Sequence, residues 1–350
     1  MPAERAPSPG RPTINDVARL ANVSKKTVSR VLNRSPFVNE ETRLRIEAII
    51  AETGYVPDPQ ARGLAFRRSF LIGMIYDNPN PQYVVNMQQG ILDGLKGSGY
   101  ELVVHPCDRR SRTYLEDVRG FVTRQKLFGV VTTPSVSEDE QLARLLEEEG
   151  CLYIRIASVA LDQPNRMIVS NDRLGGVQAA RHLLELGHTR IGFIAGPPSF
   201  RSTHERRGGL EDGLTERGLR LDPAFVAEGA YTFDSGLAAA LVLLGRTPRP
   251  TAIFAGNDEM AAGALQAARQ LGLDVPADVS IVGFDDFQLA SAVWPPLTTL
   301  RAPTRDVGLL AARRLFALGA VDVDPVPEPK TIAPKLVVRD STGPCPPIKG

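Results

Sequence analysis

Two helix-start signals stand so close together near the N-terminus that only two short helices and a tight turn fit between residues 13 and 33. Thr13 can cap the first helix, and the acidic Asp16 lies close to its N-terminus. Ser24 can cap the second helix. The apolar residues of that helix repeat at helical spacing: Val28, Val31 and Leu32. Two short helices joined by a tight turn are typical of a helix-turn-helix.

A third helix is predicted between Asn39, which can cap it, and Gly54, which ends it. We expect Leu44, Ala48 and Ala51 on this helix to cover the first two helices. Residues 12–57 are therefore predicted to form a small all-α head. Residues 1–11, rich in Pro, Ser and Arg, are expected to be a disordered tail.

The outward positions of the second helix are polar and partly basic. They comprise Ser24, Lys25, Lys26, Thr27, Ser29, Arg30 and Asn33. Lysine and arginine can donate to guanine O6 and N7, whereas serine, threonine and asparagine suit phosphate oxygens. A solvated helix face is the alternative, but the short turn and the basic bias together favour DNA binding.

The net charge of +1 hides an asymmetry between the two parts of the chain. Residues 1–69 contain 12 Lys/Arg and 7 Asp/Glu, a balance of +5. The remainder holds 41 − 12 = 29 basic and 40 − 7 = 33 acidic residues, a balance of −4. A basic head on a mildly acidic body indicates a polyanionic partner, although a solvated tail with a chance bias gives the same counts.

A short connecting segment follows over residues 58–69. Asp58 can cap a helix and Pro59 suits its first position, but about two turns are too few to persist alone in water. Leu64 has no obvious core to enter. An apolar side chain on a basic segment can wedge between base steps in a minor groove. A plain linker with one stray leucine is the alternative.

The body, residues 70–342, alternates short β-rich runs with helical patterns. The candidate strands are 71–76, 101–105, 128–132, 152–156, 167–169, 190–195, 252–255 and 279–284. Helical patterns lie between most of them, for example at 173–186, 205–217 and 259–271. This order predicts an α/β body with parallel sheets, too long for one doubly wound sheet and hence divided into two lobes. Ligands of such folds bind beyond the carboxyl ends of the strands, here in a cleft between the lobes.

Polar and aromatic residues follow several of these strands. One arginine, two aspartates, one asparagine and a serine are expected to converge on the cleft with tyrosines beside them, among them Tyr83, Ser202, Arg206, Asn257 and Asp285. A few polar groups beside aromatic faces suit a small polyhydroxylated ligand such as a sugar. Helix capping or turn chemistry could also explain Asn257 and Asp285.

Several other classes of protein are disfavoured. The sequence contains no GxxxxGK[ST], GxSxG or HExxH motif, so we predict neither an enzyme nor a cofactor or metal site. The odd number of widely spaced cysteines argues against a disulfide framework. The longest apolar run, Leu237–Leu244, is too short for a membrane span, and the first residues resemble no secretory signal, so a cytoplasmic protein is expected. A sugar-binding protein without DNA function would share the body but not the head.

Residues 13–33 and 39–65, including Gly54-Tyr-Val-Pro57 and Ala61-Arg-Gly-Leu64, resemble the head of the lactose-repressor (LacI) family. The resemblance implies a homodimer whose two heads read palindromic operator DNA. It places Lys25 and Lys26 at the main base-reading positions and Arg30 at a third. It also places Ser24, Thr27, Asn33 and Tyr55 at phosphate contacts, and Ala61 and Leu64 in a hinge helix whose paired leucines enter the minor groove.

The resemblance continues through the body in Leu186–Pro197, Ile253–Gly263, Val282–Asp286 and Pro296–Thr299, and implies a two-lobed effector domain like periplasmic binding proteins. Its principal effector contacts fall on Arg206, Asn257 and Asp285. Secondary contacts fall on Tyr83, Ser202 and Tyr231.

This sequence departs from the family's pattern at two positions, which weakens the inference of any particular sugar from its relatives. Ala157 and Ala302 stand where relatives often have Asp and Gln, and Arg155 could supply a cation beside Ala157 instead. An oligosaccharide that acts as an inducer is the preferred effector, and a purine-like co-repressor, stacked on Tyr83 and Tyr231, is the alternative. Residues 343–350 are expected to be a tail without the heptads of a tetramer, which favours a dimer.

Overall fold

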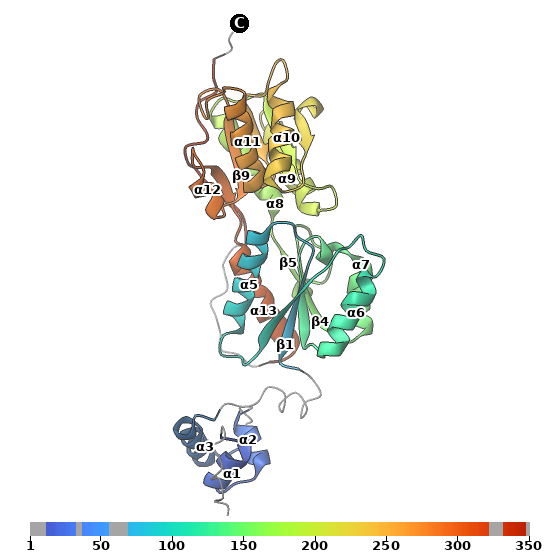
Figure 1. The fold of residues 1–350 in the computed structure, drawn as a ribbon, viewed down its shortest axis with the longest axis vertical. Coiled ribbons are helices and arrows are strands. Elements are labelled where there is room, and N and C mark those ends of the chain that lie inside the picture. Colours follow the sequence, from blue (N-terminus) through green and yellow to red (C-terminus); the bar gives the residue numbers. More distant parts are fainter. Residues whose placement is uncertain (1–11, 33–36, 56–68, 322–331, 348–350) are drawn as a thin grey trace, which may run out of the picture. The chain divides into compact units, whose positions relative to one another are not determined.

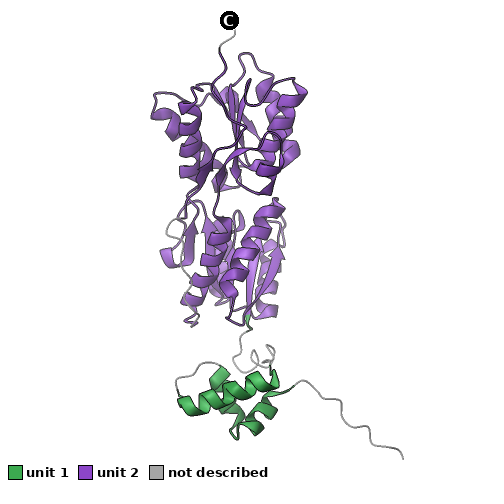
Figure 2. Ribbon diagram, turned by 90° about the vertical axis from the view of Figure 1, so that its left-hand side faces the viewer, with its two compact units in different colours: residues 1–70 green, residues 71–350 purple. Residues whose placement is uncertain are grey.

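The computed structural model describes residues 12–32, 37–55, 69–321 and 332–347. The chain forms two compact units, Met1–Phe70 and Leu71–Gly350 (Figure 2). Asn33, the hinge residues Ala61 and Leu64, and the expected tail over residues 1–11 lie outside the described residues.

The head consists of α1 (Ile14–Leu20), α2 (Lys25–Leu32) and α3 (Glu40–Thr53) (Figure 1). The predicted caps are present. The backbone N–H of Thr27 donates to Oγ of Ser24 at 3.1 Å, and that of Thr42 donates to Oδ1 of Asn39 at 2.8 Å. Gly54 ends α3 in the left-handed conformation, with φ of 65°. The helix-turn-helix and its third helix are thus confirmed.

The side of α3 that packs inward differs from the prediction. Leu44 is 57% exposed, and Ala48 and Ala51 are exposed as well. Ile46 is fully buried in the head core, and Ile49 and Ile50 pack partly buried beside it. The larger β-branched side chains set the phase of the helix, because they remove more apolar surface from water than alanines do.

The body contains two sheets, one for each lobe (Figure 1). The sheet of lobe 1 has the order β2 (Glu101–Pro106), β1 (Leu71–Tyr76), β3 (Gly129–Thr132), β4 (Leu152–Ala157) and β5 (Met167–Val169). The sheet of lobe 2 has the order β11 (Lys335–Val337), β10 (Thr298–Arg301), β9 (Ser280–Asp285), β8 (Ala252–Ala255), β6 (Ile191–Ala195) and β7 (Val226–Glu228). All pairings are parallel except that of β10 with β11.

Helices cover both sheets, as the βαβ pattern predicted. Lobe 1 carries α5 (Pro81–Leu95), α6 (Tyr114–Gln125), α7 (Glu140–Glu148) and α13 (Thr304–Leu318). Lobe 2 carries α8 (Asp172–Glu185), α9 (Arg201–Thr215), α10 (Phe233–Leu244), α11 (Asp258–Gln270) and α12 (Gln288–Ala292). The expected strands are present with shifts of a residue or so at their ends, whereas β7, β10 and β11 were not expected.

The chain passes between the lobes more than once. Residues 170–171 lead from β5 to α8, and residues 302–303 lead from β10 back to α13. Helix α13 belongs to lobe 1 because Val307, Leu310 and Leu315 share a hydrophobic core with Ile72 of β1. These passages direct the carboxyl ends of strands from both lobes toward one cleft.

Close packing of α8 against α9 fixes the geometry of the cleft. A Cβ atom on Gly209 would lie 2.0 Å from the carbonyl oxygen of Arg173, and one on Gly176 would lie 2.3 Å from that of Arg206. Only glycine permits this approach of two helix backbones. It brings Asp172, at the start of α8, beside Arg206 on α9.

The C-terminal segment packs on lobe 2 further than predicted. The backbone N–H of Cys345 donates to the carbonyl oxygen of Leu186 at 2.8 Å, and Nε2 of the buried His188 lies 3.0 Å from the carbonyl oxygen of Gly343. Residues 343–345 therefore belong to the body and not to a tail, since their backbone groups complete hydrogen bonds of lobe 2. Cys107, Cys151 and Cys345 are all free.

The described helices include none that is long and apolar enough to cross a membrane. Nor do the described residues contain a group of His, Cys, Asp and Glu side chains that could hold a metal ion.

Candidate functional site

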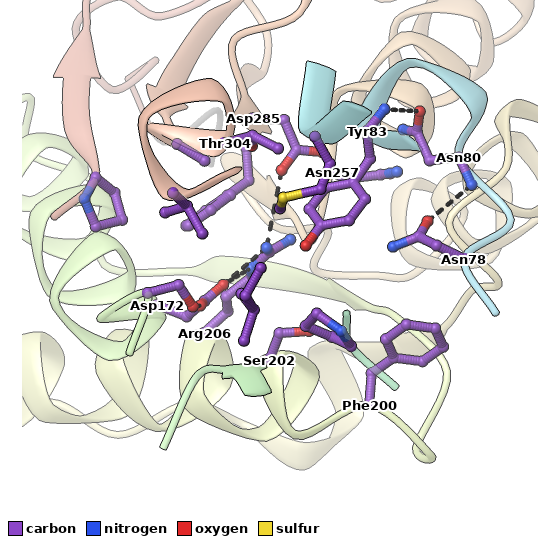
Figure 3. Close-up of a pocket in the computed structure, with 18 of the residues that line it drawn as sticks. Asn78, Asn80, Tyr83, Asp172, Phe200, Ser202, Arg206, Asn257, Asp285 and Thr304 are labelled. Carbon is purple, nitrogen blue, oxygen red and sulfur yellow. Dashed lines mark hydrogen bonds and ion pairs between the residues drawn. The ribbon is translucent and has the colours of Figure 1, made fainter. Parts of the chain in front are cut away.

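The cleft between the lobes gathers most of the predicted site residues (Figure 3). It is lined by Tyr83 from lobe 1 and by Ser202, Arg206, Tyr231, Asn257 and Asp285 from lobe 2. Apolar faces complete it, among them Ile156, Phe200 and Phe284. A concave site with a few polar groups among apolar and aromatic faces is typical of small-molecule binding.

Arg206 lies at the centre of the cleft and is buried (Figure 3). Its Nε and Nη2 lie 2.8 and 2.7 Å from Oδ1 of Asp172, and its Nη1 donates to the carbonyl oxygen of Gly256. The guanidinium carbon lies 3.7 Å from the ring centroid of Phe284. Burial alone would lower the pKa of Arg206, but nearby anionic groups, led by Asp172, outweigh it and hold the pKa above its ordinary value.

Asp285 faces Arg206 from the end of β9, with Oδ1 at 3.8 Å from Nη2. Burial raises the pKa of Asp285 to about 7, although the charge of Arg206 opposes the shift. The neighbouring Asp286 turns to the other side and pairs with Arg301 and Arg339, each at 2.6 Å. Of these two neighbouring aspartates, only Asp285 offers a carboxyl group to the cleft, which Asp172 also lines.

Asn257 both caps a helix and lines the cleft, so the two interpretations of this residue are compatible. Its Oδ1 accepts from the backbone N–H of Met260 at 2.9 Å, and its Nδ2 donates to the carbonyl oxygen of Tyr231 at 3.1 Å. The hydroxyl of Tyr231 lies 3.2 Å from Oγ of Ser202 and 2.8 Å from Oγ1 of Thr203. These bonds hold one wall of the site in a single arrangement.

Lobe 1 contributes the opposite wall through the start of α5. Oδ1 of Asn80 accepts from the backbone N–H groups of Gln82 and Tyr83 at 2.9 and 3.2 Å, which caps this helix. Burial raises the pKa of Tyr83 far above its ordinary value, so its hydroxyl keeps its proton. Tyr83 thus brings a neutral hydroxyl and an aromatic face to the cleft.

Arg155 is not a cleft residue, and its predicted role is wrong. Its Nε donates to the carbonyl oxygen of Ser137 at 2.7 Å, and its Nη2 lies 2.6 Å from Oε1 of Glu140. Neighbouring residues of a strand point to opposite faces. On β4 the cleft is lined by Ile156, so Arg155 lies on the face that η1 (Val136–Glu138) and α7 cover.

Sequence reasoning missed Asp172, the main partner of Arg206. A signal was available, because Ser170-Asn171-Asp172 follows β5 directly, just as other polar residues follow β8 and β9. Asn78 and Asn80, after β1, and Thr304, at the start of α13, also line the cleft and were missed.

The cleft is narrow in this structure. The free space between its side chains amounts to about 60 Å³. By comparison, an engineered cavity that binds benzene has a volume of roughly 150 Å³. A ligand of hexose size therefore requires the lobes to part or side chains such as Tyr83 to move.

Most of the described polar residues of α2 are exposed within the head. Ser24, Lys25, Lys26 and Arg30 are exposed, and Thr27 and Ser29 are partly buried. Tyr55 differs, because its ring is buried in the head core. Lys25 and Lys26 occupy the first turn of α2, the end of a recognition helix that commonly meets base edges.

Known families match both parts of the chain. Residues 13–58 match the family described as bacterial regulatory proteins, lacI family, and residues 180–342 match the periplasmic binding protein-like domain. The HTH-type transcriptional regulator CelR of Thermobifida fusca is 36% identical over 313 residues, which cover 87% of this chain and 91% of that protein. The chain belongs to the LacI family.

Further proteins of this kind match the chain over almost its whole length. The HTH-type transcriptional regulator GalR of Escherichia coli is 33% identical over 333 residues, 94% of this chain and 95% of its own. A solved CelR–cellobiose complex matches with a TM-score of 0.70 and 32% identity, over 95% of this chain and 100% of that one. A lac repressor dimer bound to operator and the anti-inducer ONPF matches with a TM-score of 0.76 and 30% identity, over the same shares. This LacI-family chain is a DNA-binding transcriptional regulator, and these relatives are regulators rather than enzymes.

Proposed function

We propose that this LacI-family regulator senses a small neutral polyhydroxylated ligand, preferably an oligosaccharide, in the cleft between its lobes. The observation that carries this proposal is the convergence of Arg206, Asn257 and Asp285 beside aromatic faces. Hydroxyl groups can accept from the guanidinium and the amide and donate to the carboxylate, while sugar ring faces pack on aromatic rings. The CelR relative solved with cellobiose supports this class of ligand.

The charge balance of the cleft favours a neutral ligand over an anionic one. Arg206 is already compensated by Asp172 at 2.7 Å and faces Asp285 at 3.8 Å. An anionic ligand would have to compete for one guanidinium with Asp172 and with the ionised form of Asp285. A sugar hydroxyl needs only to accept from an N–H group of Arg206 and leaves both ion-pair partners in place.

A purine-like co-repressor remains the alternative effector. The ring of Tyr231 packs edge-on against Phe200 at 5.4 Å and its hydroxyl is bonded to Ser202 and Thr203, so a stacked base would have to fit a ring held in one orientation.

The head would bind palindromic operator DNA as part of a homodimer. Lys25, Lys26 and Arg30 are proposed to read bases, and Ser24, Thr27 and Asn33 to contact phosphates, with Tyr55 supporting the head from its core. The hinge residues Ala61 and Leu64 are proposed to reach the minor groove between the two heads. The lac repressor dimer solved on its operator supports this arrangement.

Effector and operator would be coupled through two arrangements of the lobes. A ligand with different affinities for the two arrangements changes operator affinity, and operator DNA then changes ligand affinity by the same factor. We expect repression that is relieved by the ligand.

The test has two steps. Duplexes selected from a random library by the full-length protein define the operator, and operator affinity is then measured with and without cellobiose, other oligosaccharides and purines. Release by a sugar supports the proposal, whereas tighter operator binding with a purine supports the co-repressor. A selection that enriches no sequence contradicts operator recognition.

A further inference from the structure

Helix α9 begins without a cap of its own. Its N-cap residue, Phe200, has no side-chain oxygen, and its first turn contains no acidic residue. The first backbone N–H groups of a helix have no partner within the helix and require acceptors from elsewhere. The acceptors at the start of α9 are important because this helix carries Ser202 and Arg206, two residues of the proposed effector site.

The other lobe supplies an acceptor. Oε2 of Glu138 accepts from the backbone N–H of Arg201, the first residue of α9, at 3.1 Å. Glu138 ends η1, which lies between β3 and α7 in lobe 1. A carboxylate at a helix N-terminus also interacts favourably with the helix dipole. The cap of a lobe 2 helix thus comes across the cleft from lobe 1.

Glu138 is partly buried at this contact between the lobes. Its Oε1 is buried without a hydrogen-bond partner. Burial raises the pKa of Glu138, while the backbone N–H and the charge of Arg201 and the charge of Arg109 oppose the shift. Once the lobes part, water can reach this carboxylate and α9 loses its acceptor.

We propose that Glu138 is an interlobe latch, a positioning residue that caps α9 from lobe 1 and so ties the placement of Ser202 and Arg206 to lobe closure. This inference rests on the proposed function, in which the same side chains hold the effector. Closure completes the helix end and orders the site, and opening frees the first turn of α9. Effector binding and lobe position would then be coupled through one hydrogen bond.

Hydrogen exchange of the full-length protein, without effector or DNA, tests the latch directly. The wild type is compared with Glu138→Ala, which removes the acceptor, and with Glu138→Gln, which keeps an acceptor oxygen and the volume. Glu116→Gln, an exposed glutamate on α6, is the matched control. Peptides that cover residues 200–206 report on the first turn of α9.

We expect exchange at the start of α9 to rise by roughly two- to thirtyfold in Glu138→Ala, the equivalent of one lost helix cap. Glu138→Gln should lie between this variant and the wild type, and Glu116→Gln should match the wild type. Unchanged exchange in both Glu138 variants would overturn the latch. So would an increase that extends equally to α10 and α11, because it would report general destabilisation. If the alanine variant does not fold, exchange at the start of α9 in the glutamine variant still tests the latch. Since neither ligand nor operator is present, failure of the latch is distinct from failure of the proposed function.

Discussion

Arg206 directs two of its nitrogen atoms at a single oxygen of Asp172: Nε and Nη2 lie 2.8 and 2.7 Å from Oδ1. Both side chains are nearly buried, with 11% and 5% of their surfaces exposed. Breaking a buried ion pair leaves an uncompensated charge, so the pair restricts the orientation of the guanidinium. Asp172 thus positions Arg206 in the proposed effector site.

The first prediction concerns the stability of this pair. Asp172→Ala should lower the free energy of unfolding by about 3–5 kcal/mol, because Arg206 then remains buried with its main partner removed. Glu211→Ala is the control. Both side chains of the Glu211–Arg207 ion pair are more than 40% exposed, so this pair should contribute less than about 1 kcal/mol. Urea titrations measure both values. A loss below about 1 kcal/mol in Asp172→Ala would mean that the pair does not position Arg206.

The second prediction concerns the response to ligand. Arg206→Met keeps much of the volume but removes every donor, so operator affinity should no longer respond to a sugar that releases the wild type. Operator binding without ligand should remain, because Arg206 lies in the body and the residues proposed to read bases lie in the head. The measurement is a fluorescence anisotropy titration of operator DNA. A normal response would place the effector elsewhere.

The third prediction follows from the pKa of Asp285, about 7 in the folded protein against about 3.9 in an unfolded chain. The folded state binds the proton more tightly, so the stabilising contribution is complete below about pH 4 and is lost as the pH rises toward and through 7. The free energy of unfolding of the wild type, relative to Asp285→Asn, should therefore fall between pH 5 and 8. Parallel urea titrations across this range provide the test, and a constant difference would contradict the raised pKa.

The fourth prediction concerns base reading by the head. Lys26→Ala should cost about 1–3 kcal/mol of discrimination at one operator base pair. Arg19→Ala on α1, whose side chain is exposed and pairs with Asp16, serves as the control for loss of one positive charge. Affinities for the selected operator and for random DNA separate the two effects. Equal losses on both DNAs would show that Lys26 contacts phosphate alone.

Much of the body could be predicted from the sequence because buried parallel strands are continuous apolar runs. Leu71–Tyr76 and Met167–Val169 match the predicted bounds for this reason. The strands that were missed lack such runs. β7 has only three residues, none of them buried, and β11 is a short, partly exposed strand that joins lobe 2 from a distant part of the chain.

The cleft residues could be predicted because the ends of parallel strands meet at one edge of a sheet, which located Asn257 and Asp285. The face of a strand was harder to predict, and Arg155 was placed on the wrong side because both faces of β4 are buried. The phase of α3 was misjudged for a similar reason, since Leu44 and Ile46 are both apolar and only packing selects between them. The partner of Arg206, Asp172, depends on how closely α8 and α9 pack, and this contact joins distant parts of the sequence.

A neutral sugar is proposed to bind between the lobes, and a thermal-shift panel of the full-length protein tests this binding most directly. The panel contains cellobiose, other mono-, di- and oligosaccharides, and purines, each measured with the wild type and with Arg206→Met. A ligand at 100 times its dissociation constant stabilises the folded protein by about 2.7 kcal/mol, a shift that is readily measured. We predict stabilisation of the wild type by at least one sugar and none of Arg206→Met. Stabilisation by purines alone, or an equal shift in Arg206→Met, would contradict the account.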